Sequence, residues 1–323
     1  MSVENNMHIA YVLHDKSGKY CKILAASIYS LLCNSSENIC IHLLHDGTLK
    51  DNDTLKFVNM IKTLGHEIKC YNMENIVDGC HKKICESIHP IWIELFTPAV
   101  FYRMWVWEVL PIDVSKVIII DADTIINMDI AELWNLSTGD NGLAAVLDPN
   151  ITIINNSKLC QNGIINKNRY FNAGLLVIDR QKFNLSRELW NEMMLTFFSV
   201  YSNSDYPEQD MLNYYFNENC KLLDEKYNTI VEWQRYNKIN KIENKIYHYS
   251  NKSIDIVAFD EYTKLFFKYF MQTPWCDEYF MKKIISVFHS MYNAGYECAQ
   301  YSIYNSSDEG FRKIDWRDLW YKL

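Results

Sequence analysis

Short apolar runs rich in β-branched residues alternate with segments of helical periodicity up to about residue 250. The run at residues 114–121 has the composition of a central parallel strand that is buried on both faces. This alternation predicts an α/β protein built around a sheet. The expected strands are residues 8–14, 39–45, 66–71, 114–121, 142–147 and 170–179, and the expected helices are residues 19–32, 51–64, 99–109, 181–201 and 208–216.

The strand pattern stops near residue 260, and the remaining chain is helical in pattern and rich in aromatic residues. No internal repeat or flexible linker separates the two parts, in agreement with the low counts of 10 Gly and 6 Pro. A chain of 323 residues with 49% hydrophobic residues is long enough to bury a large core. We therefore expect one α/β domain over residues 1–255, followed by a helical extension over residues 256–323.

The charge balance limits the classes of partner. The chain has 32 Lys and Arg against 40 Asp and Glu, a net charge of −8, without long runs of like charge. Nucleic-acid binding is therefore not expected, and an anionic ligand would need a cation supplied with it. The 10 Cys lack C-x-x-C spacing. The N-terminal segment does not have the pattern of a leader, and no apolar run reaches the length of a membrane-spanning helix. We expect reduced thiols and a cytoplasmic location.

The common phosphate-binding glycine loops, G-x-G-x-x-G and the P-loop, are absent. Instead, Asp121 and Asp123 follow four apolar residues at the carboxyl end of an expected strand, the edge where α/β proteins bind ligands. In extended backbone these side chains point to one side, where two charges about 5 Å apart repel by ~3 kcal/mol at a dielectric of about 20. A divalent cation removes that cost, Mg²⁺ or Mn²⁺ suits oxygen ligands, and an added imidazole favours Mn²⁺. The alternative is that one Asp caps a turn while the other is solvated.

Other polar residues allow two interpretations each. His248 ends a short apolar segment and is either a third metal ligand or a packing residue. Glu208 lies in the first turn of an expected helix, where it either contacts a ligand or stabilises the helix start, with Asp205 in a capping box. Residues 172–174 bring an amide and a close backbone to a ligand, or form a plain turn. Arg103 binds an anionic oxygen or forms a surface salt bridge.

Eight segments occur in an order that resembles the family 8 glycosyltransferases, retaining metal-dependent enzymes that include bacterial lipopolysaccharide glucosyl- and galactosyltransferases. The resemblance covers about residues 7–250. The segments are IAYVLHDKSGKYCKILAASIYSLL, IHLLHDGTL, FYRMWVWEVLP, KVIIIDADTIINMDIAELW, AAVLD, YFNAGLLVIDRQKF, YPEQDMLN and YHYS. The resemblance implies a GT-A nucleotide-diphospho-sugar transferase fold with a single mixed sheet flanked by helices. It also implies Mn²⁺-dependent transfer of glucose or galactose from a UDP-sugar to a glycan or glycolipid acceptor, with Mg²⁺ as the alternative ion.

The resemblance also assigns roles to individual residues. Three would hold the metal that bridges the two phosphates: Asp121, Asp123 and His248. Three would be catalytic in the sugar pocket by positioning the sugar and stabilising a cationic transition state: Gln209, Glu208 and Asp148. Seven would bind the donor, the first two at uracil and ribose and the last at a phosphate: His14, Asp15, Arg103, Ala122, Asn172, Ala173 and Lys252. A front-face mechanism, in which the leaving phosphate deprotonates the acceptor, is the favoured route to retention.

The chain departs from the family pattern at three places. Glu208 stands where the family often has Asp, and His14 and Lys16 replace the usual residues of the base-binding loop. After His248 the chain reads HYSNKSID, without the glycine and the Pro-Trp pair that usually follow. We expect an altered phosphate-closing loop at this point.

Two other function classes remain open. A sugar-phosphate nucleotidyltransferase shares the fold and metal chemistry but needs a Gly-rich basic loop, for which LHDKSGKY is a poor match. A non-catalytic nucleotide-sugar binding protein is the other.

The basic tail FRKIDWRDLWYKL places Trp316, Leu319, Trp320 and Leu323 on one helical face, either for peripheral contact with an anionic membrane or for docking onto its own domain.

Overall fold

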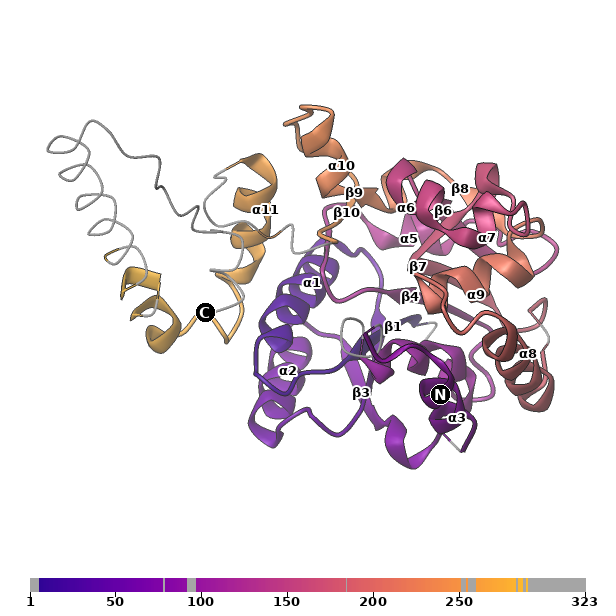
Figure 1. Cartoon of the computed structure of the whole chain (residues 1–323). Helices are drawn as coiled ribbons and strands as arrows, with labels where there is room; N and C mark the ends of the chain where they lie inside the picture. Colours follow the sequence, from indigo (N-terminus) through magenta and orange to yellow (C-terminus); the bar gives the residue numbers. More distant parts are fainter. Residues whose placement is uncertain are drawn as a thin grey trace, which may run out of the picture.

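The computed structural model describes residues 6–77, 79–91, 97–183, 185–250, 254, 260–282, 284–286 and 289. A mixed seven-stranded sheet, in the order β3-β2-β1-β4-β7-β6-β8, lies between two layers of helices (Figure 1). This architecture confirms the expected α/β class. The strands are β1 (Met7–Leu13), β2 (Ile39–His45), β3 (Glu67–Asn72), β4 (Lys116–Ile120), β6 (Leu143–Leu147), β7 (Phe171–Asp179) and β8 (Lys221–Leu223).

The strand directions bring several loops to one edge of this sheet. Strands β3, β2, β1 and β4 are parallel to one another, whereas β7 runs antiparallel between β4 and β6. The carboxyl ends of β1, β4 and β6 therefore meet the start of β7, where Ile120 pairs with Leu175. The run at β4 is buried on both faces as expected, but only its β1 side is parallel.

A second, three-stranded sheet was not predicted. It contains β5 (Thr124–Ile126), β9 (Thr229–Ile230) and β10 (Ile246–His248), in the order β5-β10-β9. Strand β10 pairs antiparallel with β5, so that His248 lies opposite Thr124. This pairing carries His248 to the segment that follows β4. Strands this short leave no readable alternation in the sequence.

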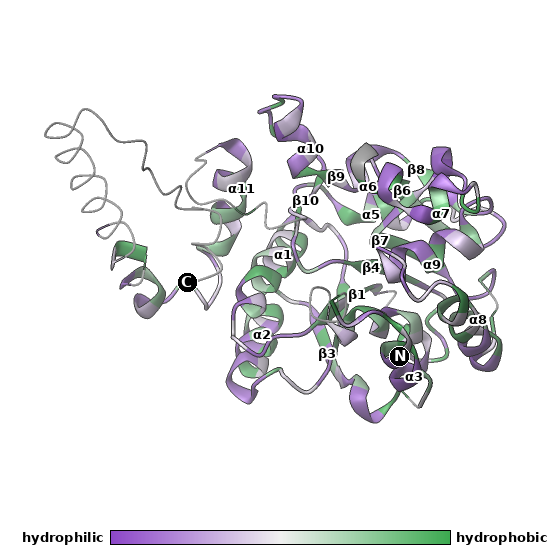
Figure 2. Ribbon diagram, viewed as in Figure 1, coloured by the Kyte–Doolittle hydropathy of each residue, from purple (hydrophilic) through white to green (hydrophobic). Residues whose placement is uncertain are grey.

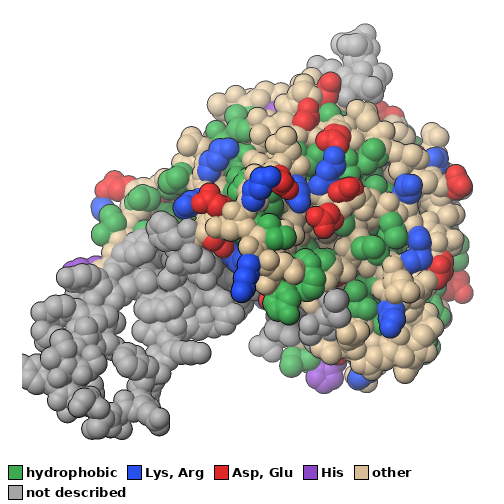
Figure 3. Space-filling view, turned by 90° about the horizontal axis from the view of Figure 1, so that it is seen from above, with side chains coloured by type: hydrophobic (Ala, Val, Ile, Leu, Met, Phe, Trp, Pro, Cys, Tyr) green, Lys and Arg blue, Asp and Glu red, His purple; other side chains and the backbone are tan. Residues whose placement is uncertain are grey.

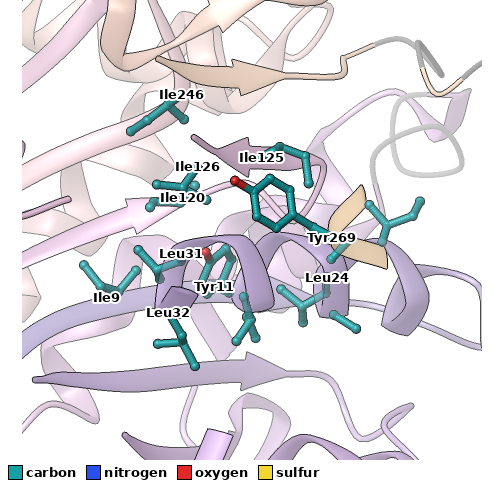
Figure 4. Close-up of a cluster of buried hydrophobic side chains, with 14 of the residues drawn as sticks. Ile9, Tyr11, Leu24, Leu31, Leu32, Ile120, Ile125, Ile126, Ile246 and Tyr269 are labelled. Atoms are coloured by element: carbon teal, nitrogen blue, oxygen red, sulfur yellow. The ribbon is translucent and has the colours of Figure 1, made fainter. Parts of the chain in front are cut away.

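One face of the large sheet packs against α1 (Tyr20–Asn34), α2 (Asp51–Thr63), α5 (Ile130–Trp134) and α11 (Glu261–Phe270). Figure 4 shows this core, in which Tyr11 of β1 and Leu24 of α1 lie close to Ile125 of β5. Helix α11 packs along α1, and the Asn34 amide donates to the Tyr269 hydroxyl at 2.8 Å. The first helix of the expected extension is thus part of the main core.

The opposite face is covered by α3 (Gly79–Ser87), η2 (Pro98–Glu108), α8 (Arg187–Val200) and α9 (Pro207–Phe216). Segment η2 corresponds to the expected helix at residues 99–109 but is a 3₁₀ helix with a break at Trp105. The shorter elements are η1 (Met73–Asn75), α6 (Ile151–Asn156), α7 (Lys158–Gln161), η3 (Lys167–Arg169), η4 (Glu225–Tyr227) and α10 (Val231–Tyr236).

Hydrophobic side chains concentrate inside the molecule. Figure 2 shows hydrophobic colours along the central strands and hydrophilic colours on outlying helices such as α10. On the face seen in Figure 3, acidic and basic side chains are interspersed. Within the described ranges, no helix has the length and apolar character needed to cross a membrane. The basic tail at residues 311–323 and the boundary at residues 255 and 256 lie outside the described residues, so both remain predictions.

Candidate active site

Asp121 and Asp123 lie directly after β4, in the turn that leads to β5. The sequence interpretation placed them on extended backbone, and the structure corrects this, because residues 121–123 have left the strand. The two carboxylates nevertheless converge. The His248 Nε2 atom is 3.3 Å from Asp123 Oδ1 and 3.7 Å from Asp121 Oδ2. One ligand atom from each residue lies within 4.8 Å of the other two, an oxygen and imidazole set that fits a divalent cation.

Two neighbours fix the imidazole of His248. Its Nδ1 atom is 3.1 Å from Asn228 Oδ1, and because an amide oxygen only accepts, this contact places a proton on Nδ1 and directs Nε2 toward the aspartates. The Asn228 amide also donates to Asn172 Oδ1 at 2.8 Å. Gly174 allows the ring to approach β7, since a Cβ there would lie 2.3 Å from His248 Cε1. Asn228 was missed because it stands in no recognisable motif.

The electrostatics of the three residues favour a positive charge between them. Burial alone would lower the pKa of His248, but the charge and hydrogen bond of Asp123, followed by the charge of Asp121, outweigh burial and raise it. Burial likewise opposes ionisation of Asp123, yet the His248 interaction lowers the pKa of that carboxyl. A bound metal ion would supply the positive charge instead and take neutral imidazole as a ligand.

Arg103 of η2 connects the aspartates to the rest of the site. It is only 6% exposed, which excludes the surface salt bridge. One terminal nitrogen lies 2.6 Å from Asp121 Oδ1, and the other donates to the Ala173 carbonyl at 2.7 Å. Burial would lower the pKa of the guanidinium, but the charges of Asp121 and Glu208 outweigh it and raise the pKa. Arg103 therefore stays charged and fixes the orientation of Asp121.

Glu208 lies in the first turn of α9 and is 8% exposed. Its Oε1 atom is 2.9 Å from Arg103 Nε but forms no aligned hydrogen bond there, since that N–H donates to the Val100 carbonyl. Burial raises the pKa of Glu208 to about 8, against the opposing charge of Arg103 and with the support of Asp121. A neutral carboxylic acid at pH 7 can donate a hydrogen bond to a ligand.

The capping-box alternative for Glu208 is wrong. Helix α9 has Tyr206 as its N-cap, and no side chain caps it there. Instead, Asp210 holds the start of the helix: its carboxylate accepts from the Tyr170 hydroxyl at 2.6 Å and from the Ser204 hydroxyl at 2.5 Å. This network fixes the direction in which the first turn of α9 meets β7.

Gln209, Asp148 and Asn172 form a hydrogen-bonded set beside the aspartates. Gln209 Oε1 accepts from the Ala173 backbone N–H at 2.9 Å, and its amide donates to Asp148 Oδ2 at 3.1 Å. The Asn172 amide donates to the same oxygen at 3.1 Å, while Asp148 Oδ1 accepts from the Asn150 backbone N–H at 2.9 Å. The plain-turn alternative for residues 172–174 is wrong, because they begin β7.

These residues surround a cleft of about 520 Å³, a volume typical of small-ligand sites. Apolar side chains, including Ile23, Ile88 and Phe101, line other parts of it. The predicted site residues on its walls are Arg103, Asp121, Asp123, Asp148, Asn172, Ala173, Glu208, Gln209 and His248.

Three further predicted donor-binding residues, which the structure describes, are not among those that line this cleft. The His14 imidazole contacts the Asp46 carboxylate. The buried Asp15 carboxylate accepts from the backbone N–H groups of Lys19 at 2.9 Å and Cys21 at 2.7 Å, so it satisfies the start of α1. Ala122 packs against the core around α1. Lys252 lies outside the described residues.

Comparison with known proteins identifies the family of this chain. A sequence model of glycosyl transferase family 8 matches residues 8–264. The chain belongs to glycosyltransferase family 8. The membership confirms the resemblance seen in the sequence, and it makes the cleft with its Asp121, Asp123 and His248 cluster the candidate active site of a glycosyltransferase.

The relatives of this family 8 glycosyltransferase are distant. A putative glycosyltransferase of Haemophilus influenzae is 27% identical over 213 residues, which are 65% of this chain and 60% of that protein. The chain thus spans less than two thirds of that relative. A lipopolysaccharide 1,2-glucosyltransferase of Escherichia coli is 25% identical over 304 residues, 92% of this chain and 76% of that protein.

Solved structures share the GT-A-like fold. The galactosyltransferase LgtC, in complex with donor and acceptor sugar analogs, has a TM-score of 0.68 and 17% identity, covering 85% of this chain and 99% of its own. The bifunctional glycosyltransferase WbbM has a TM-score of 0.65 and 17% identity, covering 85% of this chain and 51% of its own. At this identity the likeness establishes the fold, in agreement with the expected fold class.

Proposed function

We propose that the chain transfers a hexose, glucose or galactose, from a UDP-sugar to a glycan or glycolipid acceptor with retention of anomeric configuration. The observation that carries this proposal is the convergence of Asp121, Asp123 and His248 at one side of the cleft. The lipopolysaccharide glucosyltransferase among the relatives and the sugar complex of the structural neighbour support the substrate class.

Asp121, Asp123 and His248 would hold Mn²⁺, or Mg²⁺ in its place. An ion held there would supply Lewis-acid stabilisation of the charge on the leaving group. Arg103 keeps Asp121 oriented through the 2.6 Å contact, and Asn228 keeps His248 Nε2 directed toward the ion. This arrangement lets a chain with net charge −8 receive an anionic donor.

The state of three side chains supports a front-face route to retention. A double displacement needs a free carboxylate nucleophile beneath the sugar. Burial raises the pKa of Glu208 to about 8, which disfavours a free carboxylate there, and the amide of Gln209 is hydrogen-bonded at both ends. Asp148 accepts three hydrogen bonds, which weaken it as a nucleophile. We therefore assign the proton of the acceptor hydroxyl to the leaving phosphate.

Glu208, Gln209 and Asp148 then act as catalytic residues that grip the sugar. A protonated Glu208 would donate a hydrogen bond to a sugar oxygen, and the Asp148 carboxylate would stabilise positive charge that develops on the ring. The Gln209 side chain connects β7 to Asp148, since it is hydrogen-bonded both to the Ala173 backbone and to the Asp148 carboxylate. Asn172 and Ala173 complete the sugar-binding wall. His14, Asp15, Ala122 and Lys252 remain proposed donor contacts.

The experiment is release of UDP with Mn²⁺ over a panel of UDP-sugars and simple glycan acceptors. We expect UDP-glucose or UDP-galactose to be used, and both Asp121→Asn and Asp123→Asn to reduce release strongly. Asp129→Asn is a control acidic change, since Asp129 caps α5 away from the cleft. Unchanged release in the two active-site variants would contradict the metal assignment, and sugar nucleotide formed from UTP would favour a nucleotidyltransferase.

We further propose that the enzyme works in the cytoplasm, with its C-terminal tail in peripheral contact with the inner face of the membrane. The amphipathic basic pattern of residues 311–323 supports this proposal. Deletion of residues 311–323 is expected to reduce cosedimentation with anionic liposomes. Unchanged cosedimentation would contradict the membrane role.

A further inference from the structure

A second cluster of metal-ligating side chains lies at the opposite edge of the sheet from the cleft. His8 stands near the start of β1, Cys40 near the start of β2, and His42 at the middle of β2. In the parallel register His8 pairs with Cys40, and Ala10 pairs with His42, so the three side chains share one face. One ligand atom from each lies within 4.8 Å of the other two.

The two imidazoles already face each other. His8 Nδ1 is 2.9 Å from His42 Nε2, and the other nitrogen of His42 is 3.2 Å from the Tyr71 hydroxyl. The Tyr71 ring stacks on His42 at an interplanar angle of 14°. Two nitrogens bound tetrahedrally to one zinc ion lie about 3.3 Å apart, so the rings need to separate by only a few tenths of an ångström.

Two of the three side chains are shielded from solvent and the third connects them to it. His42 is 0% exposed and Cys40 is 1% exposed, whereas His8 is partly exposed and gives access from solvent. Burial lowers the pKa of both imidazoles and so favours their neutral form, in which a ring nitrogen is free to bind a metal.

Three charged side chains lie near the cluster. Lys69 has the strongest effect on His8 among them, and the carboxylates of Asp113 and Glu67 oppose it. Glu67 pairs with Cys40 across β2 and β3, and its carboxylate interacts with the thiol. The Glu67 carboxylate is therefore placed to accept the proton that Cys40 gives up when the sulfur binds a metal.

We propose that His8, Cys40 and His42 form a three-ligand site for a zinc-like divalent cation, with water in the fourth position. A set of two imidazoles and one thiolate matches the ligands that zinc prefers, whereas Mg²⁺ and Mn²⁺ prefer oxygen. Binding transfers the thiol proton through Glu67 to solvent as the sulfur–metal bond forms. The ion ties β1 to β2 far from the cleft, which gives it a structural role.

Cobalt provides the direct test, because a thiolate ligand produces a near-ultraviolet charge-transfer band. The metal-depleted full chain is titrated with Co²⁺ in excess Mg²⁺, which occupies oxygen-rich sites. We expect the band in the wild type and in Cys70→Ser, a control on the neighbouring strand β3, and no band in Cys40→Ser. The absence of the band from the wild type, or its persistence in Cys40→Ser, would overturn the proposal.

Two further variants separate a metal site from local packing. Tyr71→Phe removes the hydroxyl that orients His42, and we expect it to keep the cobalt band while zinc affinity falls about tenfold. His8→Gln alters the partly exposed ligand, so it keeps the proposal testable if Cys40→Ser fails to fold. Zinc affinity equal to wild type in His8→Gln would also overturn the assignment. The result is independent of UDP release, which probes the other edge of the sheet.

Discussion

Gly174 offers a sharp perturbation of the candidate active site, because one added methyl group meets the imidazole of His248, the proposed metal ligand. A Cβ built at this position lies 2.3 Å from His248 Cε1 and 2.8 Å from both His248 Nδ1 and Asn172 Oδ1. Carbon atoms pack at about 3.5–4.0 Å, so the ring has to move by about 1 Å. The backbone itself is not strained by alanine, since Gly174 has no positive φ.

The displacement acts on His248 because the ring has nowhere to relax. It is 4% exposed, its Nδ1 bonds to Asn228, and β10 holds it opposite Thr124. We expect Gly174→Ala to lower Mn²⁺ affinity by about 10- to 100-fold and turnover by about 100-fold. Overpacking should also reduce the free energy of unfolding by about 1–3 kcal/mol.

The assay combines Mn²⁺ binding, followed by electron paramagnetic resonance, with UDP release and urea unfolding. Gly79→Ala is the matched control, because a Cβ at Gly79 has no atom within 4 Å. Wild-type Mn²⁺ affinity and turnover in a folded Gly174→Ala protein would refute the reasoning, since they would mean that His248 does not need its present position.

Three further predictions concern the residues around the metal ligands. Asn228→Ala removes the hydrogen-bond acceptor that keeps the proton of His248 on Nδ1, so it should weaken Mn²⁺ binding about tenfold. Undiminished affinity in a Mn²⁺ titration would contradict this. Arg103→Lys keeps the charge but not the fork that holds Asp121, so Mn²⁺ affinity should again fall about tenfold; a wild-type value would speak against the orienting role. The raised pKa of Glu208 means that the folded state holds an extra proton between the ordinary carboxyl pKa and about 8, so stability from this group is complete at low pH and is lost as pH rises. Between pH 5.5 and 7.5, unfolding in urea should show wild type losing up to about 1.4 kcal/mol per pH unit relative to Glu208→Gln, and parallel pH profiles would refute the neutral acid.

Residues with a strong local signal were predictable from the sequence. The β-branched run before Asp121 fixed both a buried strand and its ligand-binding end, because buried central strands have a distinctive composition. The acidic first turn of α9 was equally visible around Glu208. In both places the local pattern and the tertiary environment point to the same structure.

Features that depend on distant contacts were not predictable. Asn228 acquires its role only when the three-residue strand β10 pairs with β9, which brings His248 beside Asn228. Strand β10 must also pair with β5, a segment about 120 residues away, to bring His248 to the aspartates. The turn at Asp121 to Asp123 replaces the expected extended backbone because β4 ends and β5 joins another sheet. The use of Asp15 at the start of α1 likewise depends on where that helix begins.

The central claim is that Asp121, Asp123 and His248 hold a cation that receives the diphosphate of a UDP-sugar. The most direct measurement is calorimetric titration of UDP into the wild type and into Asp123→Asn, each with and without Mn²⁺. We predict that UDP binds the wild type tightly only with Mn²⁺ and that Asp123→Asn loses this dependence together with most of the affinity. Equal UDP affinity without the ion, or a variant that keeps the Mn²⁺ effect, would contradict the account.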